Sequence, residues 1–234
     1  MIKECIILAG GLGTRLKTVV ADQPKVLAPV NNKPFLQYII DNAIKQGVEH
    51  IVLSTGYLHE KVEEFVNKKY PGKNISFAME NEPLGTGGGI LNALHHCKTD
   101  EVLVLNGDTF FNIDYKMFYH HHNHHQSVFS VALKPMRDFD RYGTVTCDQH
   151  RRITSFNEKK FMKEGMINAG IYILNKTAFT SLPWPQKFSM EKDFMEQYAD
   201  KIHMCAFPYD DYFIDIGIPE DYAKAENDFK TMFR

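Results

Sequence analysis

A glycine-rich segment near the N-terminus holds the residue types best suited to binding an anion. Residues 8–16 read Leu-Ala-Gly-Gly-Leu-Gly-Thr-Arg-Leu, and glycines, which lack a Cβ, let backbone N–H groups converge on a phosphate. The segment carries its own cation, Arg15, and a second cation follows at Lys25. Charge-assisted hydrogen bonds of this kind contribute roughly 1.5–3 kcal/mol each. Two fixed cations beside a row of amides suit a triphosphate, on which charge grows at one phosphorus during transfer.

Two common phosphate-binding motifs do not fit this segment. The dinucleotide fingerprint G-x-G-x-x-G fails because its third glycine position, counted from Gly11, is Leu16. The P-loop fails because no Gly-Lys-Ser/Thr follows. The alternative is a tight turn between a strand and a helix, with Arg15 merely solvated. The cation in Pro24-Lys25 makes that alternative the weaker one.

Residues 10–16, followed by Lys25 in a Pro-Lys pair, resemble the signature of the sugar-phosphate nucleotidyltransferases. These enzymes couple a nucleoside triphosphate to a sugar 1-phosphate and release pyrophosphate. The signature usually has Pro after the lysine, and Val26 here leaves the cation in place. The resemblance implies that Arg15 holds the departing phosphates and Lys25 the α-phosphate. The loop residues that it places against the nucleotide are Leu8, Ala9, Gly10, Gly11, Gly13 and Thr14.

A second glycine-rich segment, Glu82–Gly89, precedes a predicted helix. By itself it is a flexible turn that feeds a helix N-terminus, where amides and the macrodipole favour anions or carbonyl acceptors. It is similar to the family's Pro-Leu-Gly-Thr segment, which lies against the nucleotide base. That similarity implies base contacts from Glu82, Gly85 and Thr86. The identity of the base is not readable from these residues.

Two aspartates are the candidate metal ligands. Asp108 follows the apolar run 102–105 and Asn-Gly, and Asp215 stands in Phe-Ile-Asp-Ile-Gly. An Asp after Gly is usually a turn former, but the end of a buried strand in a sheet of this kind borders the ligand crevice. Both segments resemble the metal-binding segments of the family, with Phe213 in place of the usual Trp. Since Mg²⁺ prefers one or two carboxylates plus phosphate oxygens, the prediction is one Mg²⁺ between Asp108 and Asp215.

Three further segments resemble, in the same order along the chain, the segments that bind the sugar phosphate in this family. They are 140–143, 157–159 and 168–170. Alone, each is an exposed polar loop. The resemblance implies that Glu158 accepts hydrogen bonds from sugar hydroxyls and that Lys159 pairs with the phosphate. The residues that it places against the sugar phosphate are Asp108, Tyr142, Gly143, Glu158, Lys159 and Asn168. Lys160 stands where the family commonly has Pro, so the loop is expected to differ in shape.

Within the family, the segments 82–89 and 156–170 look most like the guanylyltransferases that act on D-glycero-α-D-manno-heptose 1-phosphate. That likeness implies GTP as the donor and GDP-heptose as the product. Mannose 1-phosphate guanylyltransferases and N-acetylmuramate 1-phosphate uridylyltransferases share the motifs and stay open as alternatives. A regulatory subunit without catalysis is a rival of another class. It is disfavoured because Arg15, Lys25, Asp108 and Asp215 are all present.

These residues need a scaffold, and the first half of the chain predicts one by strict alternation. Strands are expected over 5–8, 51–53, 75–79 and 102–105, with helices from Pro34, over about 59–69 and over 86–96. Such alternation predicts right-handed crossovers and a doubly wound, mostly parallel α/β sheet with helices on both faces. The ligand crevice of that Rossmann-like fold lies at the carboxyl ends of the strands.

The second half is less regular. Strands are expected over 128–133, 144–147, 153–156 and 170–174, and helices over 190–199 and 219–229. We interpret this half as completing the sheet and adding a small antiparallel piece on the sugar side. Because no linker or composition shift interrupts the chain, the prediction is a single domain, 1–234. Residues 1–110 form its nucleotide-binding half and 111–234 its sugar-phosphate-binding half.

Composition narrows the partners and the compartment. With 27 Lys and Arg against 29 Asp and Glu, the net charge of −2 argues against nucleic acid or an anionic membrane as partner. No apolar run is long enough for a membrane helix, and the first residues do not read as a signal peptide, which predicts a cytoplasmic protein. The four cysteines are too scattered for a zinc site or a disulfide framework. Whether the chain forms a homo-oligomer stays open.

A histidine run over 120–125 is a candidate for different chemistry. His121 and His125 are four residues apart and would share one face of a helix, as metal-binding pairs do. The run lacks the Glu of a zincin motif and follows Asp114 on a polar helix. We therefore expect a solvated face, with pH response as an alternative role.

Overall fold

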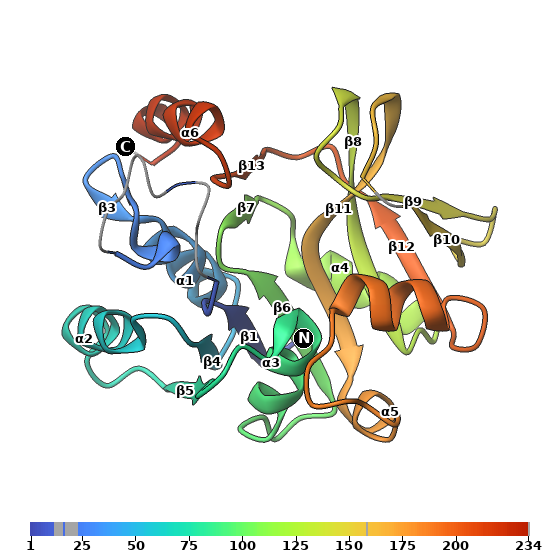
Figure 1. Ribbon diagram of the computed structural model, residues 1–234, viewed down its shortest axis with the longest axis horizontal. Coiled ribbons are helices and arrows are strands. Elements are labelled where there is room, and N and C mark those ends of the chain that lie inside the picture. Colours follow the sequence, from blue (N-terminus) through green and yellow to red (C-terminus); the bar gives the residue numbers. More distant parts are fainter. Residues whose placement is uncertain (12–15, 17–22, 158, 234) are drawn as a thin grey trace.

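The computed structural model describes residues 1–11, 16, 23–157 and 159–233 (Figure 1). Its centre is a parallel sheet in the order β6-β1-β4-β5. The four strands are β1 (Glu4–Leu8), β4 (His50–Thr55), β5 (Ile75–Met79) and β6 (Glu101–Asn106). The helices that connect them are α1 (Phe35–Lys45), α2 (His59–Lys69) and α3 (Gly85–Leu94). The strands and helices expected for the first half are all present, and the predicted fold class is confirmed.

Alternation of side chains along each strand divides the core into two layers. Ile7 of β1 packs in the layer with α1, α2, α4 (Tyr115–His124) and α6 (Pro219–Met232), whereas Ile6 packs in the layer with α3. The second layer also includes α5 (Lys176–Thr180) and the π-helix η3 (Met190–Glu196). Because helices cover both faces, the carboxyl edge of the sheet stays free for a ligand. No helix among the described residues has the length and apolarity needed to cross a membrane.

Two long antiparallel strands, β8 (Phe129–Phe139) and β11 (Met162–Asn175), extend the sheet from β6. Both are longer than the sequence predicts, because their polar outer ends pair with each other beyond the core, as Glu164 does with Arg137. Figure 1 shows this arm at the upper right. The short strands β9 (Thr144–Cys147) and β10 (Ile153–Asn157) complete it, and these two match the prediction.

Several short strands are not predicted by the sequence. β12 (Met204–Pro208) pairs in parallel with β8, and β13 (Phe213–Asp215) pairs with β7 (Thr109–Phe111). β2 (Pro29–Val30) and β3 (Lys33–Pro34) form a further two-residue ladder, after the 3-10 turn η2 (Lys25–Leu27). The strands of two or three residues carry too little periodicity to be recognised, since an alternating pattern needs about four residues, whereas β12 has five residues and its apolar run over 204–207 could have been singled out.

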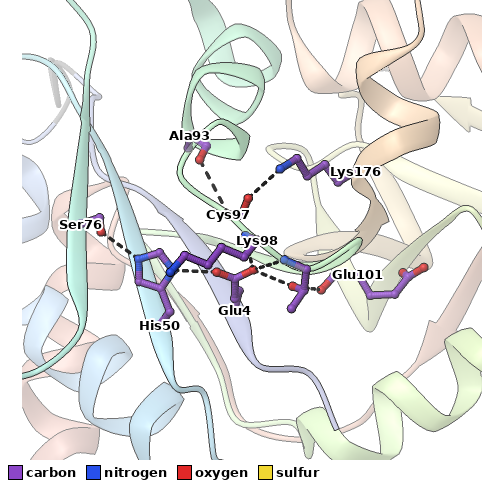
Figure 2. Close-up of polar contacts among 9 residues, drawn as sticks. Glu4, His50, Ser76, Ala93, Cys97, Lys98, Glu101 and Lys176 are labelled. Atoms are coloured by element: carbon purple, nitrogen blue, oxygen red, sulfur yellow. Dashed lines mark hydrogen bonds and ion pairs between the residues drawn. The ribbon is translucent and has the colours of Figure 1, made fainter.

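The end of the sheet opposite the crevice is fixed by a buried carboxylate (Figure 2). Glu4 of β1 lies with Oε1 2.7 Å from His50 Nδ1, and His50 Nε2 lies 2.8 Å from Ser76 Oγ. The other oxygen, Oε2, accepts hydrogen bonds from the backbone N–H groups of Lys98 and Thr99. Burial raises the pKa of Glu4, but these hydrogen bonds outweigh burial, so that its pKa is lowered. One ionised side chain thus joins β1, β4, β5 and the loop before β6.

Candidate active site

The crevice forms where the chain reverses its direction across the sheet. From β1 the chain continues through β4 and β5 on one side and then returns to β6 on the other, so that Leu8 and Asn106 end neighbouring strands. Gly107 N donates to Leu8 O at 3.0 Å. A Cβ on Gly107 would lie 2.3 Å from that oxygen, so only glycine permits this approach. The residues after both strands therefore share one crevice.

A cavity of about 300 Å³ lies over the carboxyl ends of β1 and β6. The predicted nucleotide or catalytic residues that line it are Leu8, Gly10, Gly11, Lys25, Gly85 and Thr86, and Asp108, predicted for the metal and the sugar phosphate, lines it as well. Ala9 is buried, and its N–H donates to Ser54 O at 2.8 Å. Glu82 is exposed and lines neither this cavity nor the second one described below. Gly13, Thr14 and Arg15 lie outside the described residues.

Glu80 is the acidic residue of this cavity that sequence reasoning missed. Ser54 Oγ donates to its Oε1 at 3.0 Å, and Leu84 N donates to its Oε2 at 3.0 Å. A Cβ on Gly89 would lie 2.7 Å from Oε1, so α3 approaches the carboxylate closely. Glu80 directly follows β5, which is the position relative to a parallel strand that singled out Asp108. The same argument could have found it.

A second cavity of about 510 Å³ adjoins the first, and Asn106 lines both. The predicted residues that line it are Tyr142, Gly143, Lys159, Asn168 and Asp215. Asn168 is held from several sides: its N–H donates to Gly143 O, its Nδ2 donates to Tyr172 Oη at 2.9 Å, and its Oδ1 accepts from Gly170 N at 3.0 Å. Glu158 lies outside the described residues.

One wall of the second cavity comes from η3 and the residue before it. The wall residues are Ser189, Glu191, Lys192, Met195 and Glu196. A helix is predicted over 190–199, but its first seven residues, Met190–Glu196, form a π-helix. Ser189 caps it, because its Oγ accepts from the N–H groups of Glu191 and Lys192. No pattern within the segment indicates which of its side chains would line a cavity.

The two cavities meet at a cluster of one lysine and two carboxylates. Lys25 Nζ donates to Asp108 Oδ2 at 2.5 Å and lies 3.8 Å from Asp215 Oδ1. The Lys25 side chain is only 11% exposed. Asp215 reaches the cluster because β13 pairs with β7, the strand that directly follows Asp108, and because Ile216 N donates to Asp108 O at 3.0 Å. The structure therefore brings together the predicted catalytic lysine and both predicted metal ligands.

The electrostatics of this cluster favour a cation. Burial raises the pKa of Asp215, and the negative charge of Asp108 raises it further, whereas Lys25 opposes both. Gly217 N donates to Asp215 Oδ1 at 2.7 Å. Oxygen ligands on two facing carboxylates match the preference of Mg²⁺, which takes few protein ligands and completes its shell with phosphate oxygens and water. The residues present fit such an ion.

The histidine run does not form a comparable centre. Among the described residues no three His, Cys, Asp or Glu side chains gather as a metal site would require. The expected solvated face is wrong for His122, which is 1% exposed. Its Nδ1 lies 2.8 Å from Ser130 Oγ and its Nε2 lies 2.8 Å from Glu101 Oε2. His122 faces inward because α4 packs against β8. The sequence of the histidine run by itself does not indicate this packing.

Comparisons with known proteins bear on this geometry. The sequence model of the family described as Nucleotidyl transferase matches residues 4–231. The chain is 44% identical over 227 residues to the D-glycero-alpha-D-manno-heptose 1-phosphate guanylyltransferase of Aneurinibacillus thermoaerophilus, covering 97% of this chain and 98% of the relative. It is 47% identical over 219 residues to the enzyme of that name from Campylobacter jejuni, with 94% and 96% covered. The crystal structure of HddC from Yersinia pseudotuberculosis complexed with GMP-PN superposes with a TM-score of 0.87 at 40% identity, covering 97% of this chain and all of that one.

Proposed function

The chain belongs to the nucleotidyl transferase family, and from that premise we propose that it transfers a guanylyl group from GTP to D-glycero-α-D-manno-heptose 1-phosphate, giving GDP-heptose and pyrophosphate. The observation that carries the proposal is the pair of adjoining cavities with Lys25, Asp108 and Asp215 at their junction. Such a junction suits a reaction in which each substrate occupies one cavity. The nucleotidyl group would then be transferred at the point where the two cavities meet. The heptose and the guanylyl group follow from the two relatives that share 44% and 47% of their residues with the chain.

The nucleotide cavity supports guanine through Glu80. A carboxylate only accepts hydrogen bonds and offers about four lone-pair positions, of which Ser54 and Leu84 use two. Guanine presents two neighbouring donors, N1–H and N2–H₂, to such an acceptor, whereas uracil presents a single N–H. We assign Glu80 to the base in place of a side-chain contact from the exposed Glu82.

The chemistry then follows from position and charge. An oxygen of the sugar 1-phosphate attacks the α-phosphorus in line, and pyrophosphate leaves. The attacking phosphate is already anionic at neutral pH, so no strong general base is needed. Lys159 would orient the attacking phosphate, Lys25 would hold the α-phosphate, and Arg15 would hold the departing phosphates.

Asp108 and Asp215 are the residues that would hold Mg²⁺. Bound there, the ion would neutralise charge on the phosphate oxygens of the nucleotide. Lys25 donates to Asp108 and lies near Asp215, and its positive charge opposes the burial and the Asp108 charge that raise the pKa of Asp215. In this scheme the lysine has two tasks, one toward the carboxylates and one toward the nucleotide.

The test is a matrix of nucleoside triphosphates against sugar 1-phosphates, read by pyrophosphate release with and without EDTA. We expect release only with GTP, most rapidly with the heptose 1-phosphate, and none in EDTA. A preference for UTP would contradict the guanylyl assignment, and a preference for mannose 1-phosphate would contradict the heptose. Failure of every pair would favour a regulatory protein that keeps the fold without catalysis.

A further inference from the structure

The wall formed by η3 contains an acidic residue that the proposed function leaves without a role. Glu191 is half-buried and lines the larger cavity together with predicted sugar-phosphate residues such as Asn168. Its negative charge contributes, after burial, to raising the pKa of Tyr172, whose hydroxyl accepts from Asn168. Glu191, Asn168 and Tyr172 all line this cavity. π-Helical turns are rare and frequently occur at functional sites.

The Glu191 carboxylate is held in one orientation. Its Oε2 accepts a hydrogen bond from Thr86 Oγ1 at 2.9 Å and another from Ser189 Oγ at 2.9 Å. Two of about four lone-pair positions are thereby used, which leaves acceptor capacity for a ligand. A carboxylate fixed by two hydroxyl donors recognises a donor at a defined place better than a freely rotating one.

We propose that Glu191 is a specificity-determining residue that accepts a hydrogen bond from a hydroxyl of the sugar 1-phosphate. The inference rests on the proposed function, since the hydroxyl belongs to the second substrate. A seven-carbon sugar carries one hydroxyl more than a hexose. A cavity that selects it needs a further acceptor, beyond those that the family resemblance implies at Glu158 and Asn168.

The same contacts connect the sugar cavity to the nucleotide cavity. Thr86 lines the nucleotide cavity, and its Oγ1 donates to Glu191 while accepting from Met190 N at 2.8 Å. Gly87 N donates to Phe188 O at 3.1 Å, and Phe188 N donates to Leu84 O at 3.0 Å. The loop that begins α3 is thus bonded to the segment that begins η3. Thr86 acts here as a link to Glu191, so a sugar bound at Glu191 steadies the loop beside the base.

The experiment compares wild type with Glu191→Gln on a set of monodeoxy sugar 1-phosphates, each lacking one hydroxyl. Wild type should lose roughly tenfold or more in kcat/KM for the analogue that lacks the matched hydroxyl, because hydrogen bonds to charged groups are strong. Glu191→Gln should raise the KM of the complete sugar 1-phosphate by a similar factor. For Glu191→Gln, the kcat/KM values of that one analogue and of the complete sugar 1-phosphate should be nearly equal. For the other analogues, the variant should lose as much kcat/KM as wild type does. GTP binding titrated without sugar should stay within about twofold of wild type.

The matched control is Glu64→Gln, which removes an exposed charge on α2, away from both cavities. Glu64→Gln should have the wild-type KM, the wild-type kcat/KM for each analogue and the wild-type affinity for GTP. The proposal is overturned if Glu191→Gln keeps the full wild-type discrimination, or if wild type accepts every monodeoxy analogue as well as the complete sugar. Wild type that turns over no sugar 1-phosphate would instead refute the proposed function. A fold defect in Glu191→Gln would appear in the GTP titration, and the wild-type arm can still overturn the proposal in that case.

Discussion

At the scale of single residues, the position of Lys25 is the most consequential feature. Its ammonium lies 2.5 Å from Asp108 and 3.8 Å from Asp215, in the space between the two proposed metal ligands. A divalent cation on those carboxylates would be repelled by a positive charge so close by. With a metal ion held by these carboxylates, Lys25 would be directed toward the nucleotide phosphates instead.

Lys25→Ala should therefore have opposite effects on two measurements. Pyrophosphate release should fall by about a hundredfold or more, because a fixed charge on the reacting phosphate is lost. Binding of Mn²⁺ to the nucleotide-free protein, followed by electron paramagnetic resonance, should tighten by about tenfold, because the competing ammonium is gone. Circular dichroism should remain that of wild type.

The control for this prediction is Lys134→Gln, which removes a lysine paired with the exposed Asp210 outside both cavities. It should change neither measurement. Near-normal pyrophosphate release from Lys25→Ala would count against the catalytic assignment. An unchanged Mn²⁺ affinity would show that the lysine and the metal do not share the carboxylates.

At the scale of elements, the parallel strands are fixed at both ends by different means. At the carboxyl ends, Gly107 lets the chain after β6 lie close to the end of β1. At the amino ends, Glu4 of β1 and His50 of β4 are hydrogen-bonded to each other. Glu4 is 4% exposed and its lowered pKa means that the ionised form is favoured in the folded state. A carboxylate with a lowered folded pKa adds stability above its unfolded pKa. That stability is lost as pH falls through the folded value.

Glu4→Gln should therefore destabilise the protein in a pH-dependent manner. At pH 7 we expect a loss of roughly 2–3 kcal/mol in the free energy of unfolding, because a buried charge-assisted network is broken. The difference should shrink as pH falls below the ordinary Glu pKa of 4.5 and through the lowered one. Urea unfolding at pH 7 and at pH 3.5 measures both values.

A surface pair provides the comparison for this prediction. Glu49→Gln removes the partner of Lys3, an ion pair with 47% and 64% exposed side chains. Its effect should be small at either pH, because exposed ion pairs contribute little. If the loss in Glu4→Gln is the same at both pH values, the network does not depend on the Glu4 charge.

At the scale of the whole molecule, the two halves of the chain contribute to the same sheet and the same core. β11 of the second half pairs with β6 of the first, and α6 packs on α1 (Figure 1). Phe229 of α6 is fully buried against Phe35, Tyr38 and Phe110. α6 also holds a residue of the larger cavity, since its Asp221 forms an ion pair at 2.8 Å with Arg141, which lines that cavity. We propose that 1–234 unfolds as one unit.

Phe229→Ala tests that proposal. Loss of a buried aromatic ring should cost about 3–5 kcal/mol and lower the melting temperature by roughly 6–20 °C. Differential scanning calorimetry should show one transition shifted downward as a whole. Met232→Ala, on the same helix with 38% exposure, should shift it little. Two separate transitions in either protein would contradict a single cooperative unit.

Much of the architecture could be predicted from the sequence because its signals are local. The apolar runs and helical spacing between residues 5 and 105 are each set within a few neighbours, and they gave the parallel half and its crevice. The glycine segment with its cations Arg15 and Lys25, and Asp108 near the end of an apolar run, could be singled out in the same way. The roles of these residues, the choice of Asp215 as a metal ligand and the sugar-phosphate segments came from the family resemblance.

The tertiary structure decided which of these residues meet. Lys25 and Asp108 are 83 positions apart, and Asp215 joins them only through the pairing of β13 with β7. The place of Glu80 in the nucleotide cavity depends on where β5 ends, and the place of Glu191 in the larger cavity depends on the π-helical path of η3. Such contacts follow from strand register and packing across the whole chain. No short stretch of sequence contains them, because local conformational preferences act over a few residues and pairing acts across the fold.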